Sequence, residues 1–236
     1  MPSGLDSFTP PEPSAHRHEV LAALASGLAA LKPGHRVAVA VDGVDGAGKT
    51  VLGRELTAYL SPFREVVRAS VDGFHRPRAQ RYARGRSPET YYRDSYDYAS
   101  LSARMVEPFR AGRPFATAVF DVELDAPVAE APRTAGPAAL LLVDGIFLQR
   151  PELRGHWDAA VFVDVPFEVS VPRGNSRFAG TLDADPLSEA NRRYVEGQRL
   201  YLDEARPAER ATWVVDNCDL DRPVLRHRGN KGNLRQ

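Results

Sequence analysis

Cysteine is almost absent from this chain of 236 residues, and neither sign of charge is in excess. Cys218 is the only cysteine, which excludes a disulfide framework and favours a reducing compartment such as the cytoplasm. The formal net charge of +0 gives no sign of nonspecific binding to nucleic acid or to a membrane surface. We therefore expect a cytoplasmic protein with neither nucleic acid nor a membrane among its partners.

Long apolar runs and targeting signals are lacking too. No run approaches the length of a membrane-spanning helix, and residues 1–14 lack the basic start and apolar centre of a signal peptide. The hydrophobic content of 43% is enough for a full core, and the length suits one α/β domain. We assign this domain to residues 16–226, between a disordered segment, 1–15, and a basic flexible tail, 227–236. The oligomeric state is left open, a homo-oligomer included.

Lysine is scarce as well, and one of the three lysines stands in a glycine-rich run. Gly43–Thr50, GVDGAGKT, matches the phosphate-binding pattern G-x-x-x-x-G-K-[ST] at every fixed position. The β-branched run Val37–Val41 predicts a buried strand before the loop, and Val51–Leu60 has the apolar spacing of a helix. This arrangement directs backbone N–H groups and the positive end of a helix toward one point, where a polyphosphate is favoured. A glycine turn that merely joins strand to helix is the alternative.

The loop predicts a site for a nucleoside triphosphate, with ATP and Mg²⁺ as the expected cofactors. Lys49 would reach the β- and γ-phosphates, and the Thr50 hydroxyl would bind Mg²⁺. The expected ATP-binding residues are Gly43, Val44, Asp45, Gly46, Ala47, Gly48, Lys49, Thr50 and Val51.

Five apolar runs along the chain each end in Val-Asp. Helical or mixed segments separate them, a pattern typical of a parallel doubly wound sheet with helices on both faces. Ahead of the first run, apolar residues at helical spacing predict a surface helix over His16–Leu31. The sequence thus predicts an α/β fold with a five-stranded, mostly parallel sheet that binds ligands at the carboxyl ends of its strands. The runs are Val39–Asp42, Ala69–Asp72, Leu141–Asp144, Val161–Asp164 and Trp213–Asp216.

The aspartates that end these runs have more than one interpretation. Asp144 follows the most continuous apolar run, as does the acidic residue of a second nucleotide motif that holds Mg²⁺ directly or through water. We therefore predict that Thr50 and Asp144 form the metal site, with helix capping by Asp144 as the alternative. Caps or turns are the roles expected of Asp42, Asp164 and Asp216.

Asp72 opens a long polar stretch of a different kind. Between Gln80 and Tyr98, arginines, tyrosines and aspartates are mixed. A segment this long and irregular inside a compact domain is usually a binding loop or lid, and its aromatic faces and carboxylates suit a polyol or nucleoside. The alternative is an arginine-rich hairpin exposed to solvent. We expect a substrate-binding insertion over about residues 73–135.

With these motifs, the chain resembles the uridine kinase and phosphoribulokinase group of P-loop kinases. The likeness rests on the loop and on further motifs that follow the family's order over roughly Arg36 to Asn217. These motifs are Ser70–His75, Asp94–Asp97, Ala118–Asp121, Val143–Phe147 and Val161–Asp164. The resemblance implies the P-loop NTPase fold and a kinase activity.

The resemblance also implies roles for residues of the insertion. It makes Asp72 the base that takes the proton from the acceptor hydroxyl, and it places ribose-binding carboxylates in the region of Asp94 and Asp97. The other residues expected at the acceptor are His75, Tyr96 and Phe120. Phe120 stands where uridine kinases usually carry a Tyr that helps to hold the pyrimidine, and the family's base-contacting His falls near Asp125.

An arginine-bearing lid follows the fourth strand in that family, and we expect it here at about residues 167–190. Phe167–Arg177 offers only Arg173 and Arg177, and its proline and glycine disfavour a regular helix. The lid is therefore expected to be shortened or recast, with Arg177 first and Arg173 second as catalytic cations. The substitutes on the next predicted helix are Arg192, Arg193 and Arg199.

The predicted activity is transfer of the γ-phosphate of ATP to a hydroxyl of a small molecule, a nucleoside or related sugar compound. The catalytic residues would be Asp72, Lys49, Arg177 and Arg173, because this transfer needs positioning and charge neutralisation above all. A kinase for another metabolite, such as pantothenate, a sugar or glycerate, is one alternative. A weakly catalytic nucleotide-binding regulatory protein is another. A GTPase is disfavoured because Asn230–Asn233 lacks the Asp of the guanine motif.

Overall fold

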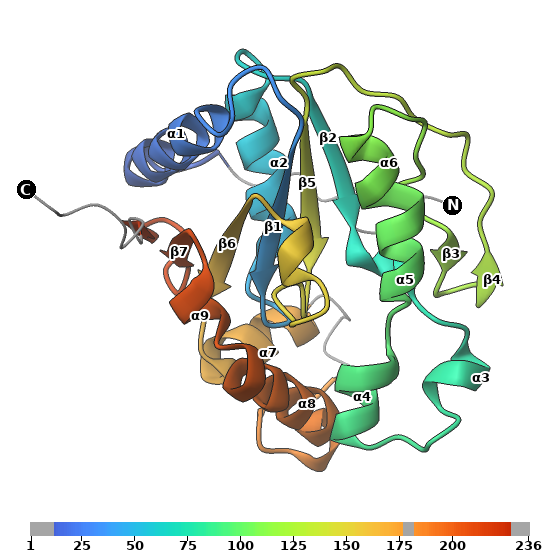
Figure 1. The fold of residues 1–236 in the computed structure, drawn as a ribbon. Helices are drawn as coiled ribbons and strands as arrows, with labels where there is room; N and C mark the ends of the chain where they lie inside the picture. Colours follow the sequence, from blue (N-terminus) through green and yellow to red (C-terminus); the bar gives the residue numbers. More distant parts are fainter. Residues whose placement is uncertain (1–11, 177–181, 228–236) are drawn as a thin grey trace, which may run out of the picture.

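A computed structural model describes residues 12–176 and 182–227 of the chain. Its centre is a six-stranded sheet in the order β2-β5-β1-β6-β7-β8, with helices on both faces (Figure 1). The strands are β1 (Val37–Gly43), β2 (Val66–Ser70), β5 (Leu140–Gly145), β6 (Ala159–Asp164), β7 (Trp213–Asp216) and β8 (Val224–His227). The predicted α/β fold is confirmed. Residues 1–11 and 228–236, within the segments predicted as disordered and flexible, lie outside the described residues.

Five of the six strands are parallel, and each overlaps one of the five apolar runs of the sequence, although the run Ala69–Asp72 shares only its first two residues with β2. β1 lies between β5 and β6, and β2 flanks β5 with Ser70 beside Asp144. The sixth strand, β8, pairs antiparallel with β7 and was not predicted. Its four residues include only two apolar ones, which is too short a pattern to show a period of two.

The two faces of the sheet bury different sets of residues. Side chains of a strand alternate between faces, so the odd-numbered valines of β1 point to one side and its alanines to the other. The valines pack on α1 (Ala15–Ala29) and α2 (Lys49–Leu60), which contribute buried leucines. α1 is the predicted surface helix, and it begins after Ser14, whose side chain accepts a hydrogen bond from the Arg17 N–H. No helix within the described residues is long and apolar enough to cross a membrane.

The insertion covers the other face and is more helical than predicted. It begins with a 3₁₀ turn, η1 (Val71–Phe74), and continues through α3 (Arg78–Arg81), α4 (Pro88–Asp94), α5 (Tyr98–Leu101), a π-helical turn, η2 (Ser102–Val106), and α6 (Glu107–Arg110). A small hairpin of β3 (Phe120–Asp121) and β4 (Ala126–Pro127) completes it. The interpretation of Gln80–Tyr98 as irregular is wrong, because Ser87 caps α4 and Pro88 occupies its first turn.

The region predicted as a lid also contains regular helices. α7 (Phe167–Asn175) follows β6, while α8 (Glu189–Ala205) and α9 (Pro207–Arg210) lead to β7; a short 3₁₀ turn, η3 (Arg154–His156), lies between β5 and β6. The expectation that proline and glycine would prevent a helix here is wrong. Pro172 lies inside α7, but it removes only one backbone donor from a helix of nine residues. Gly174 is buried in the last turn of the helix.

Candidate active site

Glycine is required at two positions of the phosphate-binding loop. Gly46 and Gly48 have φ angles of 75° and 94°, in the left-handed region that residues with a Cβ avoid. A Cβ at Gly46 would lie 2.0 Å from the carbonyl oxygen of Ser170, so α7 packs directly on the loop. Gly48 is the N-cap of α2, which therefore begins at Lys49.

Lys49 and Thr50 occupy the first turn of α2. Lys49 is only 8% exposed, and its Nζ donates to the Val44 carbonyl oxygen at 2.8 Å, so the ammonium group points back into the loop. Thr50 Oγ1 donates to Asp144 Oδ2 at 2.8 Å. The two residues predicted as the metal site thus lie together. A hydroxyl and a carboxylate beside a phosphate-binding loop are the protein ligands that Mg²⁺ takes in nucleotide sites.

The electrostatics around Asp144 suit a cation. Burial raises the pKa of Asp144, while the Thr50 hydrogen bond and the positive charge of Arg68 oppose the rise. The Arg68 guanidinium stands 3.7 Å from Asp144 Oδ1, and the nearby charge of Asp72 adds to the rise. The described residues contain no group of three His, Cys, Asp or Glu side chains that could enclose a metal. The donors present, the Thr50 hydroxyl and the Asp144 carboxylate, fit Mg²⁺, which takes its other ligands from phosphates and water.

Asp72 lies at the same edge of the sheet, two residues beyond β2. It is exposed, and its Oδ1 accepts a hydrogen bond from the Tyr96 hydroxyl at 3.0 Å. Ser70 joins this segment to its neighbour, because its Oγ donates to the Asp144 carbonyl oxygen at 3.2 Å. The His75 ring packs on Tyr96 with centroids 4.4 Å apart, and burial lowers the pKa of His75. The structure therefore brings Asp72, Tyr96 and His75 together.

Other residues predicted at the acceptor have partners within the protein. Asp94 forms an ion pair with Arg84 at 2.9 Å, and Asp97 is the N-cap of α5. Phe120 is buried in β3. Asp125, where the family's base-contacting His falls, accepts a backbone hydrogen bond from the start of α3 at 2.8 Å. Acceptor binding by Asp94, Asp97 and Phe120 stays a prediction.

The arginines expected in the lid differ in their contacts. Arg173 of α7 donates to two backbone carbonyl oxygens beyond β7, at 3.0 and 2.9 Å. Arg177 lies outside the described residues. Arg192 and Arg199 of α8 each pair with a glutamate one turn earlier in the same helix. Within the described residues, none of these three arginines forms a hydrogen bond or an ion pair with the loop. A fourth arginine, Arg193 of α8, lies over Tyr91, whose hydroxyl binds Asp45 of the loop.

The sequence did not reveal that α4 and α8 both hold the loop. The Tyr91 hydroxyl donates to Asp45 Oδ2 at 2.8 Å, and Gln198 Oε1 accepts from the Asp45 N–H at 2.6 Å. The Arg193 guanidinium lies 5.5 Å from the centre of the Tyr91 ring, and its buried Nε has no hydrogen-bond partner among the described residues. One signal was available in the sequence: Gly197, a glycine inside a helix, where a Cβ would lie 2.7 Å from the α4 backbone.

A buried carboxylate network lies directly behind the loop. Asp42, at the end of β1, is fully buried and accepts from the Tyr201 hydroxyl, from Gln149 Nε2 at 3.0 Å and from the Gly43 N–H at 2.9 Å. This is more than the cap or turn role expected of Asp42. Burial raises its pKa, and the hydrogen bonds from Tyr201 and Gln149 oppose that rise. The network joins α8 to the first residue of the loop.

Replacing Tyr201 with Phe is expected to lower the free energy of unfolding by about 1–3 kcal/mol, because Asp42 loses a buried donor. Since the folded pKa of Asp42 is raised, the native state gains stability as pH falls through that pKa. The hydrogen bond from Tyr201 does most to stabilise the charged form of Asp42, so the loss of unfolding free energy in the variant should be smaller at acidic pH. Urea unfolding of the wild type and the variant at neutral and acidic pH measures this difference. An equal loss at both would show that the hydroxyl does not act through the Asp42 charge.

Comparisons with known proteins find the fold in solved structures. No family model and no curated protein matches the sequence. The chain is similar to a possible uridine kinase from Bacillus stearothermophilus, with 24% identity and a TM-score of 0.66, covering 84% of this chain and 98% of that one. It is also similar to a candidate fructose transport system kinase from Silicibacter sp. TM1040, with 25% identity and a TM-score of 0.60, covering 81% and 94%. These similarities confirm, at the level of the fold, the resemblance drawn from the motifs.

Proposed function

We propose that this chain, whose fold is that of the uridine kinase-like P-loop kinases, is an ATP- and Mg²⁺-dependent kinase that phosphorylates a hydroxyl of a small molecule. The observation that supports this proposal most directly is the hydrogen bond from Thr50 to Asp144, beside a glycine loop that holds Lys49. Exposed Asp72 stands at the same edge of the sheet, where an acceptor could reach it. The similar structures, which are kinases by description, support this proposal.

Each of these residues supplies one part of the transfer. The loop N–H groups and Lys49 bind the phosphates, and Thr50 and Asp144 would hold Mg²⁺, which would supply positive charge against that of the transferred group. Asp72 takes the proton from the acceptor hydroxyl as the new bond to phosphorus forms. Tyr96 holds the Asp72 carboxylate through its hydroxyl, which fixes the direction in which the free oxygen points.

The acceptor class we favour is a nucleoside or a related sugar compound. The two similar structures are described as a possible uridine kinase and a candidate fructose transport system kinase, and uridine offers the hydroxyls of its ribose. Phe120 cannot donate a hydrogen bond to a pyrimidine, and an apolar wall discriminates only weakly between ring compounds. We therefore expect loose preference among nucleosides. Pantothenate and glycerate remain alternative acceptors.

A screen of nucleosides, sugars, pantothenate and glycerate with ATP and Mg²⁺ tests the proposal. The expected result is acceptor-dependent ADP release together with a product heavier by one phosphoryl group. ATP binding without any phosphorylated product would instead favour a regulatory nucleotide-binding protein. Uridine turnover orders of magnitude above every other compound would contradict the loose preference attributed to Phe120.

Replacing Arg193 with Ala should lower kcat at least tenfold and have little effect on the KM for ATP. The size of the effect is roughly that expected when one charged hydrogen bond is lost in the transition state. Arg193 of α8 lies over the ring of Tyr91, and the Tyr91 hydroxyl in turn binds Asp45 of the loop. Arg192→Ala is the matched control, because that exposed neighbour pairs with Glu189. Rates at saturating ATP and acceptor decide the matter. Equal rates for the two variants would leave Arg177 and Arg173 as the remaining candidates.

A further inference from the structure

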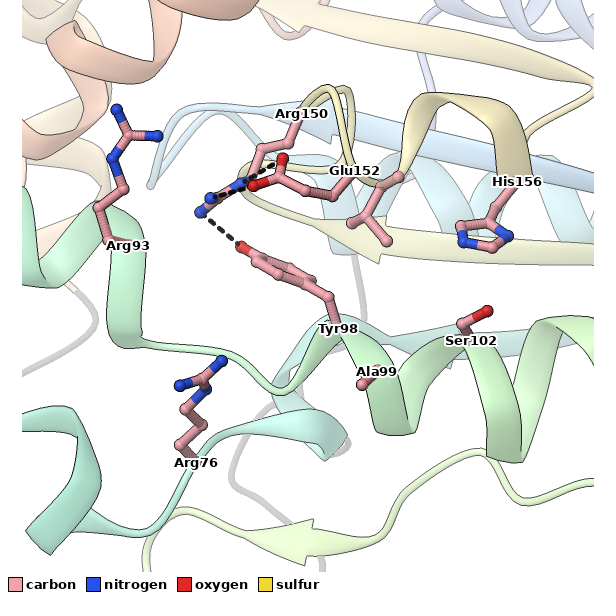
Figure 2. A pocket seen from close by; sticks show the side chains of 9 residues that line it. Arg76, Arg93, Tyr98, Ala99, Ser102, Arg150, Glu152 and His156 are labelled. Carbon is pink, nitrogen blue, oxygen red and sulfur yellow. Dashed lines mark hydrogen bonds and ion pairs between the residues drawn. The ribbon is translucent and has the colours of Figure 1, made fainter.

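Apart from the candidate active site, a basic cavity lies between α4, α5 and the turn that follows β5. Its volume is about 410 Å³, within the range of pockets that hold small organic ligands. Figure 2 shows Arg76 and Arg150 reaching toward this cavity from opposite sides, with Tyr98 beside them. Leu153 and Ala99 supply apolar wall. The other lining residues are Arg93, Ser102, Glu152 and His156.

Arg150 is the fixed centre of this cavity. It is only 3% exposed, and its guanidinium lies 4.5 and 4.8 Å from the ring centres of Tyr92 and Tyr98. One terminal nitrogen donates to the Tyr92 carbonyl oxygen at 2.6 Å. The other donates to Glu152 Oε1 at 2.8 Å, as drawn in Figure 2. The side chain of Glu152 is 52% exposed, so the only carboxylate in the lining can leave Arg150 for solvent.

Arg76 adds a cation that forms no ion pair within the described part of the chain. Its Nε donates to the Tyr96 carbonyl oxygen at 3.0 Å, and within the described residues its two terminal nitrogens have no hydrogen-bond partner. Arg93 contributes a third guanidinium, which is paired with Glu204 outside the cavity. Once Glu152 turns to solvent, the guanidinium groups of Arg150 and Arg76 are both left for a ligand, and two such groups favour one with two negative charges.

From this geometry we propose that the cavity binds a small phosphate monoester, whose phosphoryl group replaces the Glu152 carboxylate on Arg150 and also takes the free nitrogens of Arg76. The site is separate from the candidate active site, because neither Asp72 nor His75 lines the cavity. Tyr96 is 3% exposed and stands between the two sites: its carbonyl oxygen accepts from Arg76 and its hydroxyl donates to Asp72. A bound phosphate ester would therefore act on the segment that positions the proposed base.

Titration of the ¹⁵N-labelled protein with inorganic phosphate, and separately with ribose 5-phosphate, tests this proposal at constant ionic strength. The backbone amides of residues 150–153 report on the cavity, and those of residues 44–50 report on the phosphate-binding loop. We expect both groups of amides to shift, with the ester binding the cavity more tightly than free phosphate because it also fills the apolar wall. This readout requires no turnover, so it succeeds or fails independently of the proposed kinase activity.

Three variants identify the residues responsible. Arg76→Gln should weaken binding of the ester, read at residues 150–153, by about tenfold, because one charged hydrogen bond is lost. The response of the phosphate-binding loop should not change. Glu152→Gln should tighten it several-fold, because the competing charge is removed. Arg104→Gln, an exposed neighbour of Ser102 outside the cavity, should change nothing. Absence of any shift at residues 150–153, or equal affinities in all three variants, would overturn the proposal.

Discussion

Replacing Lys49 with Ala is expected to lower kcat by about 10³-fold or more while the fold stays intact. Lys49 is the only cation in the glycine loop, and in the closed site its charge would act on the group being transferred. The fold should survive because Ala is a strong helix former at the first position of α2. The single hydrogen bond lost, to the Val44 carbonyl oxygen, lies within the loop itself.

The rate at saturating ATP and acceptor is the measurement, with thermal unfolding as the folding control. Lys32→Asn is the matched variant: Lys32 lies before β1, at the opposite end of that strand, and Asn tolerates its positive φ of 39°. That variant should keep its rate. A folded Lys49→Ala protein with near-normal kcat would show that the glycine loop is not the active phosphate site.

The sheet could be predicted because its strands carry a strong local signal. β1, β5, β6 and β7 are buried almost throughout, so each appears in the sequence as an apolar run that reaches an aspartate; β2, with Arg68 and alternating burial, shows the signal only at its end. β8 has no such signal, because it is an edge strand of four residues with Arg226 and His227 in it. α7 was not predicted because proline disfavours a helix locally. In the structure, the packing of this helix on Gly46 outweighs the effect of Pro172.

The site could be predicted where its residues lie at the ends of neighbouring parallel strands. Thr50 follows β1 and Asp144 ends β5, and adjacent parallel strands bring such residues together. Arg193 and Tyr91 could not be placed in this way, since they meet through packing of two helices about a hundred residues apart in the sequence. The buried position of Asp42 is also a tertiary effect, because Tyr201 reaches it from α8.

Asp72→Asn should lower kcat by about 10²–10⁴-fold, the usual contribution of a general base, with little change in ATP affinity. Asn has nearly the shape of Asp and can still accept the hydrogen bond from Tyr96, so positioning is preserved while the basic oxygen is lost. Steady-state rates and a separate ATP-binding titration distinguish the two effects. A variant whose ATP affinity falls as steeply as its rate would argue against a role confined to the acceptor.

Asp144→Asn should act differently, by raising the Mg²⁺ concentration needed for half-maximal rate. Burial raises the pKa of Asp144, so acidification should protonate it before an ordinary aspartate and weaken Mg²⁺ binding. The wild-type requirement for Mg²⁺ should therefore increase as pH falls through that raised pKa, whereas the requirement of Asp144→Asn should change far less. Mg²⁺ titrations of wild type, Asp72→Asn and Asp144→Asn at two pH values make the comparison. Since Asp72 is exposed and Asp144 is hydrogen-bonded to Thr50, only the second should hold the metal. Identical Mg²⁺ curves for the two variants would refute this division of roles.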